Sequence, residues 1–178
     1  GIKHPRNLIG FIRWGGTKFN RLFHSKPPKN AANNILGSDW DNLVILDACR
    51  YDLFTQANLG LEGRLSQKIS PASSSKEFIE RNFVGQTAHD CIYITGNPYA
   101  SILDGTEFNK IIPAYDVAWD SERGTVLPDD ITELTKSAHD SNPNKRLIIH
   151  YMQPHYPFLS SDGPTGRIKN DGFQFGST

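Results

Sequence analysis

Short apolar runs alternate with amphipathic stretches along most of the chain. The runs are rich in β-branched residues and apolar on both faces, as the central strands of a parallel sheet must be. They predict buried strands at 43–46, 91–95 and 146–151, with a more exposed strand at 111–119. The amphipathic stretches predict helices at 51–56, 73–82 and 128–139. This alternation of strands and helices predicts an α/β fold with a parallel sheet.

Polar residues follow each of the three buried strands, at 47–52, 95–97 and 150–155. In parallel α/β sheets the carboxyl ends of the strands meet at one edge, and ligands bind there. The predicted helix that opens with three serines can reach the same edge. We therefore expect these polar clusters to form one site.

Asp47 comes directly after four apolar residues. A carboxylate at a strand end is often only solvated, or paired with a neighbour such as Arg50. Held on a rigid strand, it is also the kind of ligand that a hard divalent cation prefers. Both interpretations stay open, and Asp47 is the candidate metal ligand.

The serines Ser73, Ser74 and Ser75 admit two roles. Serine hydroxyls commonly cap helices by accepting hydrogen bonds from backbone N–H groups. A hydroxyl at a helix N-terminus is also well placed to accept a phosphoryl or sulfuryl group, because the same N–H groups stabilise an anionic transition state. From the sequence, capping and catalysis remain alternatives.

Among the histidines, His155 is the candidate for chemistry, because prolines on both sides fix the turn that carries it. A loop histidine without a role is the alternative. His150 is expected to pack within its strand, and His89 and His139 to lie on the surface. The chain has no HExxH, CxxC, Walker-type or GxGxxG motif, so zinc protease, zinc finger, P-loop and dinucleotide-binding functions lack support.

Charge divides the chain unequally. Residues 1–30 contain seven basic residues and no acid, whereas the remainder contains twelve basic and nineteen acidic residues, a formal charge of −7. We expect a basic amphipathic arm at 1–30 ahead of an α/β domain at 31–178. Because the net charge is +0, the chain as a whole has no electrostatic drive toward nucleic acid, and no such partner is expected.

Apolar residues within 6–24 partly fit one helical face, and two interpretations stay open. One is a helix packed on the domain, and the other is a basic amphipathic segment on a membrane surface. No run approaches the length of a membrane span, so a cytoplasmic protein is expected, with membrane association through residues 1–30 as the second interpretation. Cys49 and Cys91 are expected to be packed, reduced thiols, and the tail from residue 160 to contain no strand or helix.

Three segments go beyond generic patterns. They are DWDNLVILDACRYD at 39–52, SPASSSKEF at 70–78 and HYMQPHYPF at 150–158, with shorter stretches at 95–98 and 124–128. Together they resemble the first strand, the nucleophile segment and the His-x-Pro-Phe segment of archaeal sulfatase-like proteins in the alkaline phosphatase and sulfatase superfamily. The resemblance covers residues 39–158.

This resemblance implies a three-layer αβα sandwich of the alkaline-phosphatase type, incomplete at its C-terminus. It implies that Asp47 binds a divalent cation, with Ca²⁺, Mg²⁺, Mn²⁺ and Zn²⁺ all open. It also implies that Ser73 is the nucleophile, with Ser74 as the alternate register, and that His155 contacts the ester oxygen or the leaving group.

Two departures qualify the resemblance. The formylglycine signature of true sulfatases is absent, which favours phosphate esters, and the family's later Asp-His-Gly segment has no match before Thr178. Weak cation binding and weak turnover are therefore expected of these residues. The first hypothesis is a metal-dependent hydrolase or transferase that uses a serine nucleophile on phosphate or sulfate esters of small molecules or glycans. The alternative is a non-catalytic sulfatase-like binding or scaffold domain in a glycan or cell-surface pathway.

Overall fold

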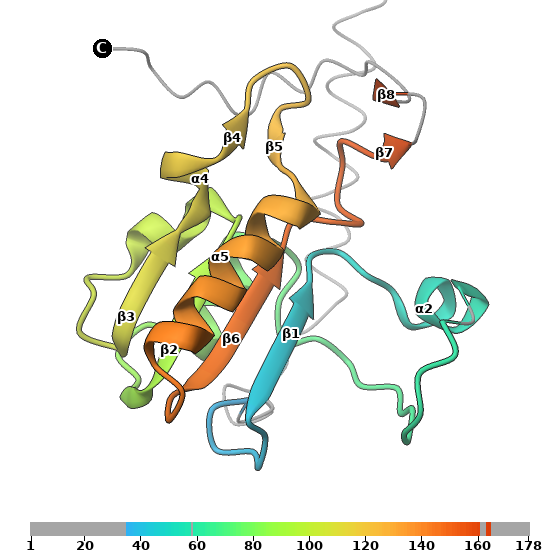
Figure 1. Ribbon diagram of the computed structural model, residues 1–178. Coiled ribbons are helices and arrows are strands. Elements are labelled where there is room, and N and C mark those ends of the chain that lie inside the picture. The colour runs from blue at the N-terminus through green and yellow to red at the C-terminus, as the bar shows by residue number, and fades with distance from the viewer. Residues whose placement is uncertain (1–34, 58, 161–162, 165–178) are drawn as a thin grey trace, which may run out of the picture.

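The computed structural model describes residues 35–57, 59–160 and 163–164. At its centre is a four-stranded parallel sheet with the strand order β1-β6-β2-β3. The strands are β1 (Asn42–Leu46), β2 (Ala88–Thr95), β3 (Phe108–Pro113) and β6 (Arg146–Tyr151). Because all four are parallel, their carboxyl ends lie at one edge (Figure 1). The predicted α/β class with a parallel sheet is confirmed.

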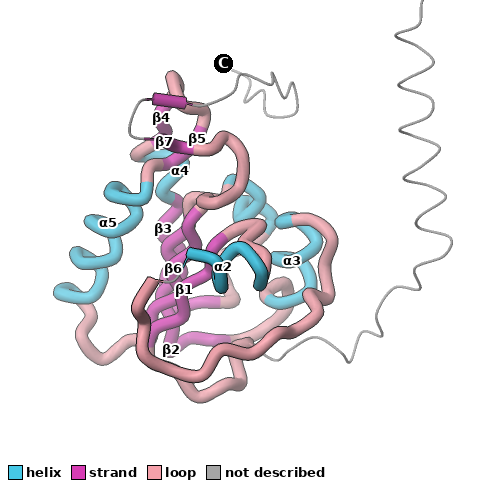
Figure 2. Tube along the Cα trace, turned by 90° about the vertical axis from the view of Figure 1, so that its right-hand side faces the viewer, coloured by secondary structure: helices cyan, strands magenta, loops and turns pink. Residues whose placement is uncertain are grey.

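Two helices cover opposite faces of this sheet, as the edge-on view in Figure 2 shows. Helix α3 (Ser75–Asn82) contributes Ile79 to one buried cluster, and α5 (Pro128–Ser141) contributes Ile131 to the other. Pro128 suits the first turn of α5, where its missing N–H leaves no helical bond unmade. The result is a layered arrangement of helix, sheet and helix.

Short elements connect these layers. They are α2 (Tyr51–Ala57), the 3₁₀ helix η2 (Pro98–Ile102), α4 (Ala114–Val117), and the antiparallel pairs β4 (Trp119–Asp120) with β5 (Thr125–Val126) and β7 (Leu159–Ser160) with β8 (Gly163–Pro164).

Two predictions about these segments were wrong. The strand expected at 111–119 ends at Pro113, because proline has no backbone N–H to continue the ladder, and α4 follows directly. The tail from residue 160, expected to lack strands, contributes Ser160 and Gly163–Pro164 to the β7–β8 pair. Pairs this short are made by backbone hydrogen bonds, which apolar periodicity does not report.

The turn after β2 depends on close packing. A Cβ atom added to Gly96 would lie 3.2 Å from Met152 Cγ and 3.3 Å from Ile131 Cδ1. The Gly96 N–H donates to the carbonyl oxygen of His150 at 3.0 Å, which extends the β2–β6 pairing. Glycine therefore lets β2 leave the sheet tightly against β6 and carries Asn97 to the carboxyl edge.

The predicted arm at 1–30, including its helix at 6–24, lies outside the described residues. Within the described ranges, no helix is both long and apolar enough to cross a membrane. Both cysteines are free thiols. Cys91 is buried in β2 as expected, but Cys49 is not fully packed, because β1 ends at Leu46 and Cys49 falls in the turn that follows.

Candidate active site

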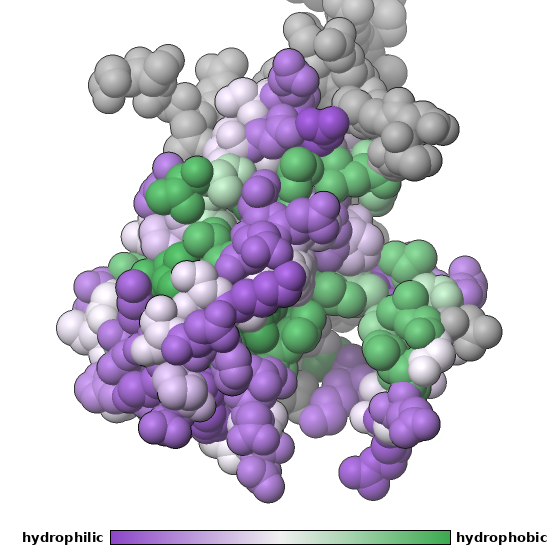
Figure 3. Space-filling model, in the orientation of Figure 1, coloured by the Kyte–Doolittle hydropathy of each residue, from purple (hydrophilic) through white to green (hydrophobic). Residues whose placement is uncertain are grey.

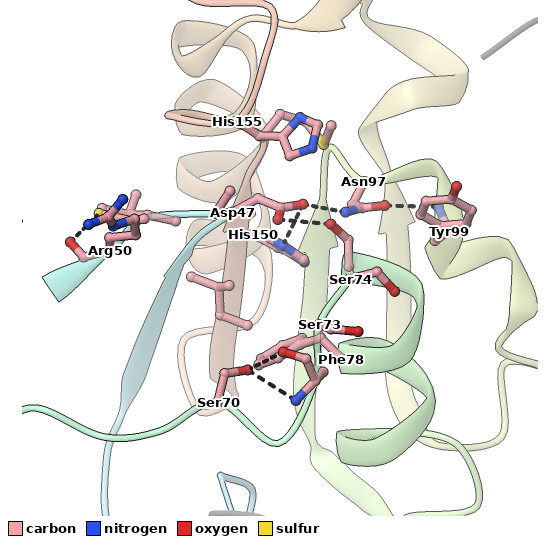
Figure 4. Close-up of a pocket in the computed structure, with 17 residues that line it drawn as sticks. Asp47, Arg50, Ser70, Ser73, Ser74, Phe78, Asn97, Tyr99, His150 and His155 are labelled. Atoms are coloured by element: carbon pink, nitrogen blue, oxygen red, sulfur yellow. Dashed lines mark hydrogen bonds and ion pairs between the residues drawn. The ribbon is translucent and has the colours of Figure 1, made fainter. Parts of the chain in front are cut away.

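The three predicted polar clusters meet at the carboxyl edge of the sheet, as expected. They line a pocket of about 630 Å³ together with the start of α3 (Figure 4). The polar lining residues from these segments are Asp47, Arg50, Ser73, Ser74, Ser75, Asn97, His150 and His155.

Asp47 is the centre of the polar contacts in this pocket, although it is only 8% exposed. Its Oδ1 accepts a hydrogen bond from Ser75 Oγ at 2.9 Å, and its Oδ2 accepts one from Asn97 Nδ2 at 2.6 Å. The Asp47 N–H donates to the carbonyl oxygen of Tyr151 at 3.0 Å, which prolongs the β1–β6 pairing by one residue. Ala48 then turns the chain away with a φ of 59°.

Ser75 is the serine that the structure brings to Asp47. It is the first residue of α3, and its side chain lies on the helix face that points to the sheet edge. The sequence analysis weighed all three serines with a helix start at residue 73, and the resemblance then favoured Ser73, with Ser74 as the alternate, over Ser75. A helix start two residues further along would have singled it out.

Ser73 and Ser74, the predicted nucleophile and its alternate, line the pocket but make local contacts. Ser74 is the N-cap of α3, and its Oγ accepts from the Glu77 N–H at 3.3 Å. The Oγ and the N–H of Ser73 both donate to Glu77 Oε2 at 2.9 Å. These hydrogen bonds from Ser73, together with Arg81, lower the pKa of Glu77 to about 2. The structure thus assigns both serines to the capping of α3, and a catalytic role for either stays a prediction.

Asn97 fixes the direction of the Asp47 carboxylate. Its side chain is almost fully buried, and its Oδ1 accepts from the Tyr99 N–H at 2.9 Å as the N-cap of η2. That bond leaves the amide nitrogen to face Asp47. The sequence placed 95–97 at this edge but assigned Asn97 no role. The available signal was an asparagine directly before Pro98, a common start for a helical turn.

His150 lies beneath Asp47 and is buried, as expected. Its Nδ1 is 2.7 Å from the Tyr93 hydroxyl, and its Nε2 is 3.8 Å from Asp47 Oδ2. Burial lowers the pKa of His150 to about 4, and the opposing effect of Asp47 is smaller, so the ring is neutral near pH 7. A carboxylate facing Nε2 favours the tautomer with the proton there, and the Tyr93 hydroxyl then donates to Nδ1. Its contact with Asp47 was not predicted.

His155 reaches the pocket from the loop after β6. Its Nδ1 lies 2.6 Å from the carbonyl oxygen of Tyr156, and its N–H donates to the carbonyl oxygen of Met152 at 2.9 Å. Because a carbonyl oxygen can only accept, Nδ1 carries the proton, and a neutral ring has its lone pair on Nε2. Figure 4 shows the ring on the side of Asp47 away from Ser73.

The described residues supply only part of a cation site. Asp47 is the one acidic residue among those that line the pocket, and within the described ranges no group of three or more His, Cys, Asp or Glu is placed to hold a metal ion. Ca²⁺ takes six to eight oxygen ligands, and Mg²⁺ requires six. Asp47 and the Ser75 hydroxyl therefore do not complete a site for either ion by themselves.

The chain was compared with protein-family models, with curated proteins and with solved structures, and none of them matches it.

Proposed function

We propose that this pocket transfers a phosphoryl or sulfuryl group from an ester, with Ser75 as the nucleophile. The observation that carries the proposal is the 2.9 Å hydrogen bond from Ser75 Oγ to Asp47 Oδ1 at the start of α3. It joins a hydroxyl to a carboxylate that can accept its proton. The first turn of a helix also presents backbone N–H groups that have no acceptor within the helix and that favour a bound anion.

The proposed reaction has two steps. Ser75 Oγ forms a bond to the phosphorus or sulfur atom of the ester while the bond to the leaving oxygen breaks. The Ser75 proton passes to Asp47 Oδ1, and the leaving oxygen takes a proton from water. In the second step a water molecule or an acceptor hydroxyl attacks the same centre while the bond to Ser75 Oγ breaks. Asp47 returns its proton to Ser75 Oγ, and the attacking oxygen releases its own proton to solvent.

Asn97 and His155 have supporting parts in this proposal. Asn97 holds Asp47 Oδ2 and so leaves Oδ1 directed at Ser75. His155 lines the pocket beside Asp47 and can contact an oxygen of the ester through Nε2 when that atom is protonated.

We further propose membership of the alkaline phosphatase and sulfatase superfamily, with a phosphate ester as the favoured substrate. In support, the three segments that carry the resemblance contribute to one pocket, and helices lie on both faces of a parallel sheet. A divalent cation, where bound, would supply Lewis-acid chemistry, and Asp47 is the residue proposed to hold it. No step above uses a cation, since the described residues do not complete its site.

The test compares alanine variants of the three serines in the full chain, assayed with nitrophenyl phosphate and nitrophenyl sulfate. Assays are run with chelator and with added Mg²⁺, Mn²⁺, Ca²⁺ or Zn²⁺. Ser75→Ala should abolish turnover, whereas Ser73→Ala and Ser74→Ala should retain most of it. Full activity in Ser75→Ala would reject the assignment, and loss confined to Ser73→Ala would restore the register predicted from the sequence.

A binding domain without turnover is the second candidate, and the single carboxylate in the pocket favours it. In that case phosphate should bind to the wild-type chain in calorimetry, Ser75→Ala should weaken the binding, and no ester should be hydrolysed with any cation. Measurable hydrolysis that depends on Ser75 would exclude this candidate.

A further inference from the structure

Strand β1 is covered on only one of its two faces. Leu43 and Ile45 pack against the buried cluster on the α3 side. Val44 pairs in register with Ile149, a residue of the cluster beneath α5, so Val44 points to the α5 side. Yet Val44 is 55% exposed and belongs to neither cluster. A central apolar residue of a strand is thus left in solvent.

The exposed face arises because α5 lies over β6 and β2 and does not extend to β1. Among the described residues, no helix packs on β1 from this side. Figure 3, viewed from the α5 side, shows apolar side chains over β1 and over α2, with the surface hollowed between them. Tyr51 and Leu53 of α2 are also exposed. A patch of this kind commonly marks a docking site.

The chain that precedes β1 packs on the opposite face of this edge strand. Leu36 and Trp40 contact the buried cluster on the α3 side, and Trp40 Nε1 donates to the carbonyl oxygen of Ile35 at 2.7 Å. Residues 6–24 span ~28 Å as a helix, more than the ~17 Å length of β1. Residues 25–34 between them can extend to ~33 Å. Residues 6–24 are therefore long enough to cover β1, and residues 25–34 are long enough to carry them around this edge strand to its open face.

Charge also favours this segment. Helix α5 carries four acidic residues and one lysine, namely Asp129, Asp130, Glu133, Asp140 and Lys136, and two further acids precede β1, namely Asp39 and Asp41. Residues 1–30 carry seven basic residues and no acid. A basic helix beside α5 would place opposite charges next to each other, while its apolar residues face Val44.

We propose that residues 6–24 dock as an amphipathic helix on the open face of β1, alongside α5. This docking supplies the missing part of the second helical layer. It does not depend on the function proposed for the pocket, which lies at the carboxyl edge of the sheet.

Amide hydrogen exchange of the full chain tests the docking. In the wild type, residues 8–23 should exchange at least tenfold more slowly than unstructured chain, independently of protein concentration. Val44→Asp should remove this protection, while the amides of β6 keep theirs and so show that the sheet is intact. The matched control is Val117→Asp, which should leave residues 8–23 protected. Val117 is 72% exposed on α4, and α4 follows β3, the strand at the other end of the strand order from β1.

A second variant tests the charge contribution without touching β1. Glu133→Lys together with Asp129→Lys should reduce the protection of residues 8–23, and raised salt should do the same in the wild type. Unprotected residues 8–23 in the wild type, or protection unchanged in Val44→Asp, would overturn the proposal. Protection that appears only with anionic lipid vesicles would assign the segment to a membrane surface instead. Protection that grows with protein concentration would assign it to a second copy of the chain.

Discussion

The three consecutive serines at the start of α3 belong to two different groups of hydrogen bonds. One group joins residues far apart in the sequence, and the other joins near neighbours. Ser75 joins Asp47, and Asp47 joins Asn97, across 28 and 50 residues of sequence, in a buried group beside His150. Ser73 and Ser74 bind Glu77, three or four residues away, at the surface. Identical serine side chains thus make different contacts, because the helix starts at Ser75. Position relative to the helix start, more than residue type, decides which serine reaches Asp47.

The largest expected effect comes from removing the centre of the buried group. Asp47→Ala leaves the Asn97 amide and the Ser75 hydroxyl without their acceptor and should lower the free energy of unfolding by about 4 kcal/mol. Urea denaturation measures this loss. Asp52→Ala is the control, because Asp52 is exposed and pairs only with Arg50 nearby, and it should stay within about 0.5 kcal/mol. A loss below 1 kcal/mol in Asp47→Ala would show that the buried contacts contribute little.

The two groups should also respond to acid in different pH ranges. Because the folded pKa of His150 is about 4 and the reference value is 6.5, the unfolded chain binds the proton more tightly. Burial of neutral His150 is therefore fully compatible with folding above pH 6.5. As the pH falls toward 4, protonation of this histidine in the unfolded chain lowers the free energy of unfolding by at most about 3 kcal/mol. The pKa of Glu77 is about 2 against a reference of 4.5, so its contribution is lost only below pH 4.5.

Unfolding free energies measured from pH 7 to pH 3 separate these contributions. His150→Gln should flatten the curve between pH 6.5 and pH 4 and leave the fall below pH 4.5. Glu77→Gln should do the reverse. An unchanged slope between pH 6.5 and pH 4 in His150→Gln would mean that this histidine is not the group that titrates.

Alanine at two of the serines should separate stability from chemistry. Ser74→Ala removes the N-cap of α3 and should cost about 1 kcal/mol while turnover persists. Ser75→Ala should cost less than about 0.5 kcal/mol, because water in the pocket can donate to Asp47 in its place, and on the proposed function it should abolish turnover. Thermal melts and ester assays on the same samples check both. Equal effects of the two variants in both measurements would contradict the division of roles.

The smallest expected effect concerns the turn that follows Asp47. Ala48 has a φ of 59°, a conformation that glycine adopts without a steric penalty. Ala48→Gly should therefore raise the free energy of unfolding, and the gain should be about 0.5 kcal/mol after the added freedom of the unfolded chain is counted. Urea denaturation measures it, with Ala57→Gly in α2 as a control that should destabilise. Destabilisation by Ala48→Gly would show that this backbone conformation carries no strain.

Most of the sheet could be predicted because its strands are apolar on both faces. The runs at 43–46, 91–95 and 146–151 correspond to β1, β2 and β6, and helix α5 followed from Pro128 and the acidic first turn. The change from strand β3 to helix α4 within 111–119 could not be predicted. Residues of both elements pack against the cluster beneath α5, so both are apolar. The spacing of apolar residues indicates burial, and in a short segment it does not distinguish a strand from a helix.

The sequence predicted where the pocket lies better than it predicted which residues contact one another in it. The topological rule for parallel sheets brought Asp47, the serines and His155 to one edge, and the pocket there agrees with it. The contacts of Asp47 with Ser75 and Asn97 could not be predicted, since each depends on where a helical element begins to within one residue. Helix boundaries are the least certain part of any prediction from local sequence.

The strand order also bears on how the chain acquires its structure. β1 is synthesised before β6, which is its one strand partner among the described residues, so Asn42 cannot pair until Leu147 has been made. At ribosomal speeds of roughly 5 to 20 residues per second, that wait lasts on the order of 5 to 20 s. During it the uncharged sequence Asn-Leu-Val-Ile-Leu is available to chaperones and to other nascent chains. Closing so long a loop should also make the arrival of β6 the slow step of refolding.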